Sequence, residues 1–389
     1  MLHRRSTPFW RDVRFLRVAS QALFLLAVVL LIYFFVNNML FNLAKRGMNL
    51  GFDFLRVPAS FALGESVIDF DPSHSYGRAF LAGLLNTLKV ALIGIPLATI
   101  VGILIGIARL STNWLVARLA TVYVEVLRNT PLLVQCVFWY FAVFTKMPAV
   151  RNQIALPGPV YLNNRGLSMV WFDRTATFGL WALLVLAGLV AGVALWRWWT
   201  RKMVETGRDG YPTLAAIAVV LGVALAGWYL LPEPPATLNF PAVVNQNVRG
   251  GAKLSPELSA ILFALVFYTA SYIAEVVRAG VQAVSKGQVE AARALGLKPG
   301  KVMQLVVFPQ ALRVIIPPLT SQYLNLTKNS SLASVIGFPD LFYIAMAVQS
   351  QSGRVIESFL LIMAVYLTFS LTTSLLMNIY NRAVRLTER

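Results

Sequence analysis

Eight long runs of apolar residues divide this chain, and segments that are polar or rich in Gly and Pro separate them. A run of about 20 apolar residues is the signal of a membrane-spanning helix, because a hydrocarbon core of about 30 Å needs that many at 1.5 Å each. The pattern therefore predicts an all-α polytopic membrane protein with about eight transmembrane helices. The runs lie near residues 19–40, 79–108, 119–145, 177–196, 213–232, 257–283, 314–338 and 355–379.

The first run is predicted to be a spanning helix rather than a secretory signal peptide. Five arginines precede it, as they can in a signal peptide, but the stretch ASQALFLLAVVLLIYFFV is longer than a normal signal core. The following NNMLFN shows no small-residue cleavage pattern. We therefore expect this helix to stay in the membrane.

Composition and charge agree with a place in the bilayer and predict an orientation. Of 389 residues, 58% are hydrophobic and only 13% charged, which is too apolar for an ordinary soluble domain. The net charge of +18 is unevenly distributed: with the N-terminus inside, 19 of the 34 Lys and Arg fall in inner segments and 11 in outer loops. The positive-inside rule then places both termini in the cytoplasm.

Several kinds of chemistry are absent from the sequence. Cys136 is the only cysteine, and His3 and His74 are isolated, so neither a disulfide nor a metal site is expected. Neither a Walker A pattern nor any other Gly-rich nucleotide fingerprint occurs. We expect a chain without cofactor or metal that does not hydrolyse ATP itself.

The order of the segments predicts four parts. Residues 1–78 form a cytoplasmic tail, the first transmembrane helix and a polar outer loop. Residues 79–145 form the first part of a helical core, and residues 257–389 form its second part. Between them, residues 146–256 read as an insertion with two extra transmembrane helices and outer loops rich in Pro and Asn.

A segment without a spanning stretch, residues 285–313, faces the cytoplasm in this arrangement. SKGQVEAARAL is a plausible helix, because its Ala, Arg, Glu, Gln and Leu residues are good helix formers. Gly296 stops that helix, and Pro299 can begin a second one that continues to Pro309. The small Ala291 and Ala292 leave room for another protein to approach. Spacing alone leaves two interpretations open: an amphipathic loop on lipid headgroups, or a docking surface.

The same segment resembles the EAA loop of permease subunits in binding-protein-dependent ATP-binding-cassette importers. Glu290, Ala291, Ala292, Gly296 and Pro309 match that motif, while Val306 and Phe308 replace the more usual Ile and Leu. Three further stretches resemble the polar amino acid uptake branch: YVEVLRNTPLLVQCVFWYF, YIAEVVRAGVQAV and PPLTSQYLNLTKNSSLASVIGFPDL. The resemblance covers residues 79–145 and 257–382, and the insertion is similar to that of the larger, Q-type subunit of general L-amino-acid importers.

This resemblance implies a function. It implies a type I importer-like core that moves amino acids across the bacterial inner membrane by alternating access. The implied partners are a second similar permease, two cytoplasmic ATP-binding-cassette ATPase subunits and a periplasmic amino-acid-binding protein. The loop would be the coupling helix that docks on the ATPase, through Glu290, Ala291, Ala292, Arg293, Leu295, Gly296, Leu297 and Pro309.

Ionisable residues inside the apolar runs are candidates for a substrate pathway, because a charge in hydrocarbon is costly without a partner or a water-filled cavity. Glu125 and Arg128 are three residues apart, as are Glu275 and Arg278, so each pair can meet on one helix face. These pairs fit either a local ion pair at a helix end or a role in a gate. Gln135 joins the same set of candidates.

A polar cluster interrupts the seventh run. If that helix begins at Pro317 and Pro318, Lys328 lies about ten residues, or roughly 15 Å, into it and near the bilayer middle. With Asn329, Ser330 and Ser331 it suits a substrate α-carboxylate in a cavity, although polar packing between helices is an alternative.

Two other functions compete with the importer. A secondary carrier driven by protons or sodium would use Glu125 or Glu275, but it predicts matching broken helices in two related halves, and no clear repeat is found. A membrane enzyme would need a nucleophile with a base, or a metal cluster, and two isolated histidines supply neither.

Overall fold

The computed structural model describes residues 13–45, 47, 50–207, 210–244 and 247–384. Among these, seven helices are long and apolar enough to cross a membrane, and a bent pair can supply an eighth. The prediction of a helical membrane protein with about eight spans is therefore confirmed. The seven are α1 (Val13–Lys45), α2 (Tyr76–Arg109), α5 (Phe178–Thr206), α6 (Pro212–Leu230), α7 (Pro256–Gln282), the continuous helix Pro299–Ile336, and α12 (Val355–Val384).

The predicted third span, residues 119–145, is not one straight helix. It consists of α3 (Trp114–Asn129) and a second helical piece over Leu132–Lys146, and the chain bends by 102° between them. The break has a local cause: Thr130 is extended, as a residue before proline prefers, and Pro131 begins the next helix, α4 (Leu132–Val137). After α4 the chain continues through a π-helical segment, η3 (Phe138–Val143), and a short 3-10 turn, η4 (Phe144–Lys146).

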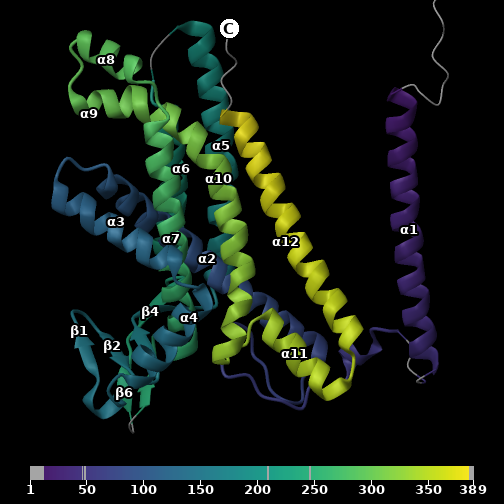
Figure 1. The fold of residues 1–389 in the computed structure, drawn as a ribbon. Helices are drawn as coiled ribbons and strands as arrows, with labels where there is room; N and C mark the ends of the chain where they lie inside the picture. The colour runs from purple at the N-terminus through teal and green to yellow at the C-terminus, as the bar shows by residue number, and fades with distance from the viewer. Residues whose placement is uncertain (1–12, 46, 48–49, 208–209, 245–246, 385–389) are drawn as a thin grey trace, which may run out of the picture.

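The centre of the bundle is the pairing of α2 with α7, which Figure 1 shows in the middle of the molecule. Small residues allow this close approach: a Cβ at Gly102 would lie 2.6 Å from Cβ of Ile273, and one at Gly106 would lie 2.8 Å from Cβ of Val277. Helix α10 (Phe308–Asn329) packs on α7, and α11 (Leu341–Ser352) packs on α2 and α12.

The described part of the insertion contains the two predicted helices and eight short strands that the apolar pattern did not predict. Strands β1 (Ile154–Leu156), β2 (Val160–Asn163), β3 (Gly166–Met169) and β8 (Ala252–Leu254) form one antiparallel sheet. β4 (Trp171–Arg174) pairs with β5 (Ala236–Asn239), and β6 (Ala242–Val244) with β7 (Asn247–Arg249).

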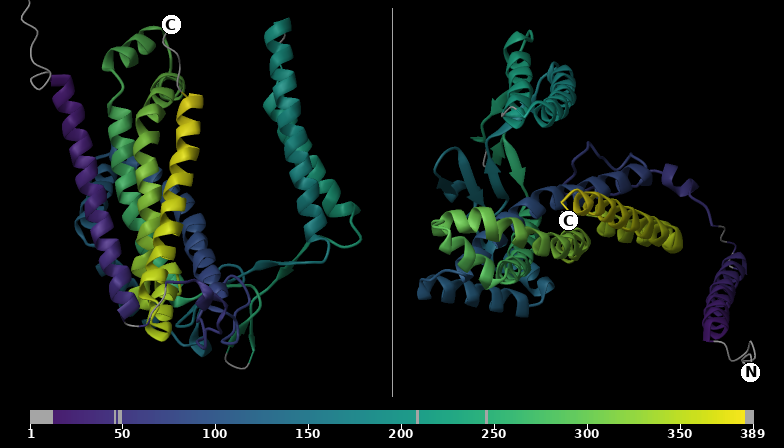
Figure 2. Two further views of the ribbon diagram at one scale, coloured as in Figure 1. Left: turned by 90° about the vertical axis from the view of Figure 1, so that its right-hand side faces the viewer. Right: turned by 90° about the horizontal axis from the view of Figure 1, so that it is seen from above.

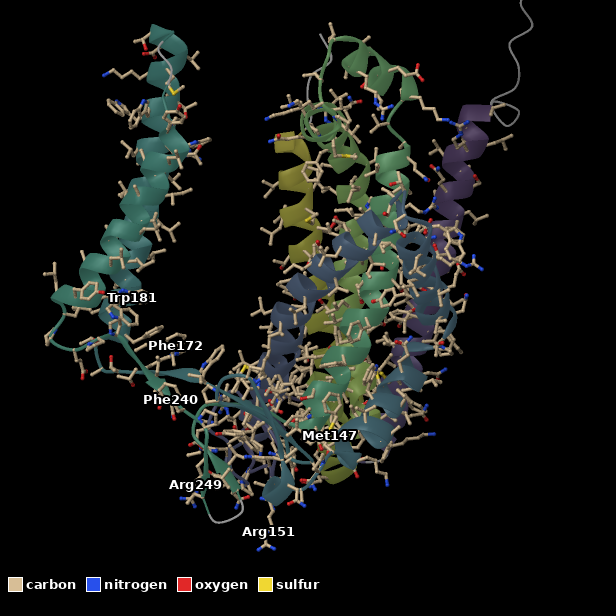
Figure 3. All side chains as sticks on the ribbon, turned by 90° about the vertical axis from the view of Figure 1, so that its left-hand side faces the viewer. Met147, Arg151, Phe172, Trp181, Phe240 and Arg249 are labelled. Atoms are coloured by element: carbon tan, nitrogen blue, oxygen red, sulfur yellow. The ribbon has the colours of Figure 1, made fainter. Side chains whose placement is uncertain are left out.

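The α5–α6 hairpin stands apart from the bundle in both views of Figure 2. Its helices pack mainly on each other, and the Trp181 indole N–H donates to the Ala224 carbonyl at 2.9 Å. Figure 3 shows Trp181 at the base of the hairpin, where β4 and β5 connect it to the rest of the molecule. Helix α1 also stands apart (Figure 1), and no residue in its most apolar stretch is buried.

Candidate functional site

The segment that resembles a coupling loop forms a helical hairpin at one end of the bundle (Figure 1). Helix α8 (Lys286–Ala294) ends before Gly296, whose φ of 80° is the left-handed conformation that favours glycine, and α9 (Pro299–Val302) begins with Pro299. Both sequence predictions are confirmed. The hairpin has its own small core of Ala292, Val302 and Val307.

The predicted end of the second helix at Pro309 is wrong. A π-helical turn, η6 (Met303–Val307), links α9 directly to α10, so Pro309 is an early residue of a helix that continues to Asn329. The wider turn before Pro309 accommodates a residue that cannot donate a backbone hydrogen bond. The α8–α9 hairpin is therefore continuous with α10 rather than a separate loop.

One face of α8 is exposed and built almost entirely from small residues. Gly287, Glu290, Ala291 and Ala294 lie on that face at helical spacing, while Val289 and Ala292 face the hairpin core. Arg293 is exposed beside it, Leu295 at the tip is 83% exposed, and Leu297 packs partly into the core. A partner can thus approach the backbone of α8 closely and meet one carboxylate and one apolar side chain.

The predicted pair of Glu275 with Arg278 is present and is part of a larger network. Glu275 also accepts a hydrogen bond from Arg109, the last residue of α2, and Arg278 Nη1 donates to Gln282 Oε1 at 2.6 Å. The network ties the end of α2 to the part of α7 that leads into α8. Its geometry is that of a structural clamp next to the hairpin.

The other predicted pair does not form. Glu125 Oε2 accepts from Asn129 Nδ2 at 3.3 Å, and the Arg128 guanidinium lies over the Tyr272 ring, 4.9 Å from its centre. Both charged side chains are exposed, although Arg128 contacts Tyr272 on α7. Arg128 therefore remains available to an anionic group.

Gln135 acts as a local cap in the structure. It is buried, and its Nε2 donates to the carbonyls of Leu127 at 2.9 Å and Thr130 at 3.0 Å. These carbonyls lie at the end of α3, where Pro131 interrupts the helix. Its contacts therefore favour a role in holding the bend over a role in the substrate pathway.

The Lys328 cluster lies elsewhere along its helix than the sequence predicted. Because α10 begins at Phe308, Lys328 is near its far end, beside the 3-10 segment η7 (Ser330–Ile336), and not halfway along. The Ser330 and Ser331 hydroxyls each donate at 2.8 Å to backbone carbonyls of their own helix, which favours packing for these two residues. Lys328 is exposed and Asn329 half-buried.

Sequence reasoning missed a second network, at the opposite end of the bundle. Glu65, in the loop before α2, accepts from Lys89 Nζ and from the Ser255 hydroxyl, each at 2.5 Å. Asn86 Nδ2 donates to the carbonyls of Glu65 at 3.0 Å and Pro339 at 2.8 Å. The loop is thereby joined to α2 and to the start of α7. A lysine inside an apolar run was the available signal, because it required a carboxylate.

We expect Glu65→Gln to lower the free energy of unfolding by about 1–2 kcal/mol, because Lys89 loses its carboxylate inside a span. The Glu65 and Lys89 side chains are 14% and 27% exposed, so water offsets part of the loss. Chemical denaturation in detergent measures it. Glu233→Gln, at an exposed position in the loop after α6, is the matched control, and equal effects of the two changes would contradict the assignment.

Asp340 is a fully buried carboxyl group at the start of α11. Its Oδ1 accepts from the Tyr343 backbone N–H at 2.8 Å and caps the helix, whereas Oδ2 has no partner among the described residues. Burial disfavours the charged form and raises the pKa of Asp340 to about 7.

This raised pKa predicts a pH dependence. An aspartate in the unfolded chain has a pKa of about 3.9, so between that pH and about 7 the folded state binds more protons at Asp340 than the unfolded state does. The free energy of unfolding therefore falls as pH rises through this range. Between pH 5.5 and 8 we expect the free energy of unfolding of the wild type to fall by about 1–2 kcal/mol. That of Asp340→Asn should not fall in this way, because Asn does not titrate and also caps helices. Thermal melting at both pH values tests this, with Asp69→Asn as an exposed control. Parallel pH profiles of wild type and Asp340→Asn would contradict it.

Comparison with known proteins gives matches over most of the chain. Residues 212–386 match the family described as binding-protein-dependent transport system inner membrane component. The general L-amino acid transport system permease protein AapQ of Rhizobium johnstonii is 46% identical over 380 residues, covering 97% of this chain and 94% of that protein. The putative amino-acid ABC transporter permease protein YhdX of Escherichia coli is 44% identical, with 100% of both chains covered. The glutamate/glutamine/aspartate/asparagine transport system permease protein BztB of Rhodobacter capsulatus is 38% identical, with 97% and 96% covered.

Proposed function

This chain belongs to the inner membrane components of binding-protein-dependent transport systems, and we propose that it is the permease subunit of an ATP-driven amino acid importer. The observation that carries the proposal is the α8–α9 hairpin, which projects from the bundle and is continuous with α10. Three relatives that align over nearly the whole chain are named as amino acid permeases, and this supports the substrate class.

The hairpin gives the proposal a mechanical basis. A cytoplasmic ATPase that binds the exposed face of α8 would move α10, because α8 shares a small core with α9 and η6, and these continue into α10 without a break. The clamp of Glu275 with Arg109 and Arg278 would carry the same motion to α2 and α7. ATP binding and substrate delivery need only favour different arrangements of these helices.

We assign the partners on the same basis. Two ATPase subunits would each take one coupling hairpin, one from this chain and one from a second, similar permease. A periplasmic binding protein would deliver the substrate. Arg128 and Lys328 are the candidates for the substrate α-carboxylate, because both are exposed cations within the helical part of the chain.

Uptake of a labelled L-amino acid into vesicles tests the function. The vesicles contain this chain with its candidate partner permease and ATPase, the binding protein is added outside, and internal ATP is compared with an imposed ion gradient. We expect uptake that requires ATP and binding protein and that survives collapse of the gradient. Uptake driven by the gradient without ATP would instead establish a secondary carrier, with Glu125 and Glu275 as coupling candidates.

A further inference from the structure

A cavity of about 660 Å³ lies between the bundle and the four-stranded sheet of the insertion. One wall is formed by α2 and α7, another by the segment from η3 to Met147, and the third by the sheet. The aromatic rings of Trp139, Phe263 and Phe267 line the helical side, where they contact one another. Figure 3 shows Met147 beside the bundle, close to this sheet.

The strand register explains why the sheet wall is apolar. Leu162 pairs with Leu167, and Leu167 pairs with Leu254, so these side chains share one face with Met169. All four line the cavity. On the opposite face lie Tyr161, Ser168 and Lys253, so the sheet is amphipathic. A lipid-exposed sheet edge is unfavourable in hydrocarbon, so we expect this sheet at the membrane surface, with its apolar face on the cavity and its polar face toward water.

The lining excludes polar occupants. The only polar groups on the lining side chains are the Ser259 hydroxyl, which is buried and has no partner among the described residues, and the indole N–H of Trp139. The lining side chains offer water at most these two groups, and cavities that are almost entirely apolar stay dry. A zwitterionic amino acid would leave at least one charge unpaired, which is unfavourable in an apolar site.

Depth and size select among the apolar occupants. On α2 the lining residues Ile93, Leu97 and Val101 form one stripe in the middle of a spanning helix, so the cavity reaches hydrocarbon depth. A helix of a second permease is 10–12 Å wide, which is much wider than an extended hydrocarbon chain. A hydrocarbon chain is narrow and flexible enough to enter.

We propose that one acyl chain of a membrane phospholipid occupies this sheet-covered cavity. The bound chain fills the space between the bundle and the insertion and so joins the sheet to α2 and α7. Cavity-filling substitutions are the sharpest test. Val101→Phe, from α2, and Leu167→Phe, from β3, both place a ring in the cavity, whereas Ile103→Phe on α2 points outward and is the matched control.

The first measurement is native mass spectrometry of the full-length chain after detergent exchange, alone and with its co-purified partner subunits. We expect one phospholipid per wild-type chain in both samples, an unchanged level in Ile103→Phe and at least a fivefold lower level in Val101→Phe and Leu167→Phe. Absence of lipid from the wild type, or an equal level in the filled variants, overturns the proposal. Lipid that is lost when the partner subunits are present assigns the cavity to a protein contact and also overturns it.

A second measurement needs no filled variant to fold. Trp139 lines the cavity, so its fluorescence should be quenched by phospholipids brominated along their acyl chains. We expect the quenched fraction to fall in Trp139→Phe relative to wild type. Identical quenching in the two proteins would show that no brominated chain reaches Trp139 and would overturn the proposal.

Discussion

Replacing Glu290 with arginine is expected to lower ATP-driven uptake at least tenfold and to weaken co-purification of the ATPase, while the chain still inserts into the membrane. Glu290 is the only charged residue on the small-residue face of α8, and it is exposed. Reversing its charge places a cation against the surface that the carboxylate would otherwise meet. A tenfold loss needs about 1.4 kcal/mol, which is modest for a charge reversal at an interface.

The matched control is Glu205→Arg, which makes the same charge change at an exposed position on α5, away from the hairpin. Ala291→Trp provides a second route, because a large ring on the same face blocks approach without a change of charge. Both hairpin variants leave the core of Ala292, Val302 and Val307 untouched, so the hairpin should still fold. Normal ATPase co-purification and normal uptake in Glu290→Arg would mean that this face is not the docking surface.

The α8–α9 hairpin could be predicted from the sequence because the residues that end and begin its helices act locally. Gly296 and Pro299 each impose a backbone conformation on their own position, so the turn between α8 and α9 follows from adjacent residues. Thr130 and Pro131 carried the same kind of signal for the bend after α3, but the apolar run around them was long enough to suggest one uninterrupted span. The strands of the insertion are only three or four residues long, which is too short for a clear alternation.

The networks at the two ends of the bundle depend on distant residues. Glu65 and Lys89 are 24 positions apart, and Arg109 and Glu275 are 166 apart, so no spacing rule joins them. The sequence did indicate that each buried charge needed a partner. The partner that each charge meets is set by the close packing of α2 with α7 and by the path of the loop before α2. Both are properties of the tertiary structure.

The second large effect is expected at the clamp: Glu275→Gln should lower the free energy of unfolding by about 3 kcal/mol. The Arg109 side chain is only 10% exposed, and its Nε has no partner among the described residues, so Glu275 supplies its compensating charge. Arg278 is 30% exposed and keeps its hydrogen bond to Gln282, so the substitution removes less stabilisation from Arg278 than from Arg109. Chemical denaturation in detergent measures the change, and Glu205→Gln is the exposed control.

A double variant distinguishes the loss of the attraction between the two side chains from the cost of leaving the Arg109 charge uncompensated. If the cost of Glu275→Gln arises because Arg109 is left uncompensated, then Arg109→Gln in the same chain removes that charge and recovers part of the stability. The double variant should therefore be more stable than the sum of the two single changes predicts, by 1 kcal/mol or more on the scale typical of directly interacting residues. Additive losses would mean that Arg109 and Glu275 act independently, and the clamp could then not transmit motion from the hairpin to α2.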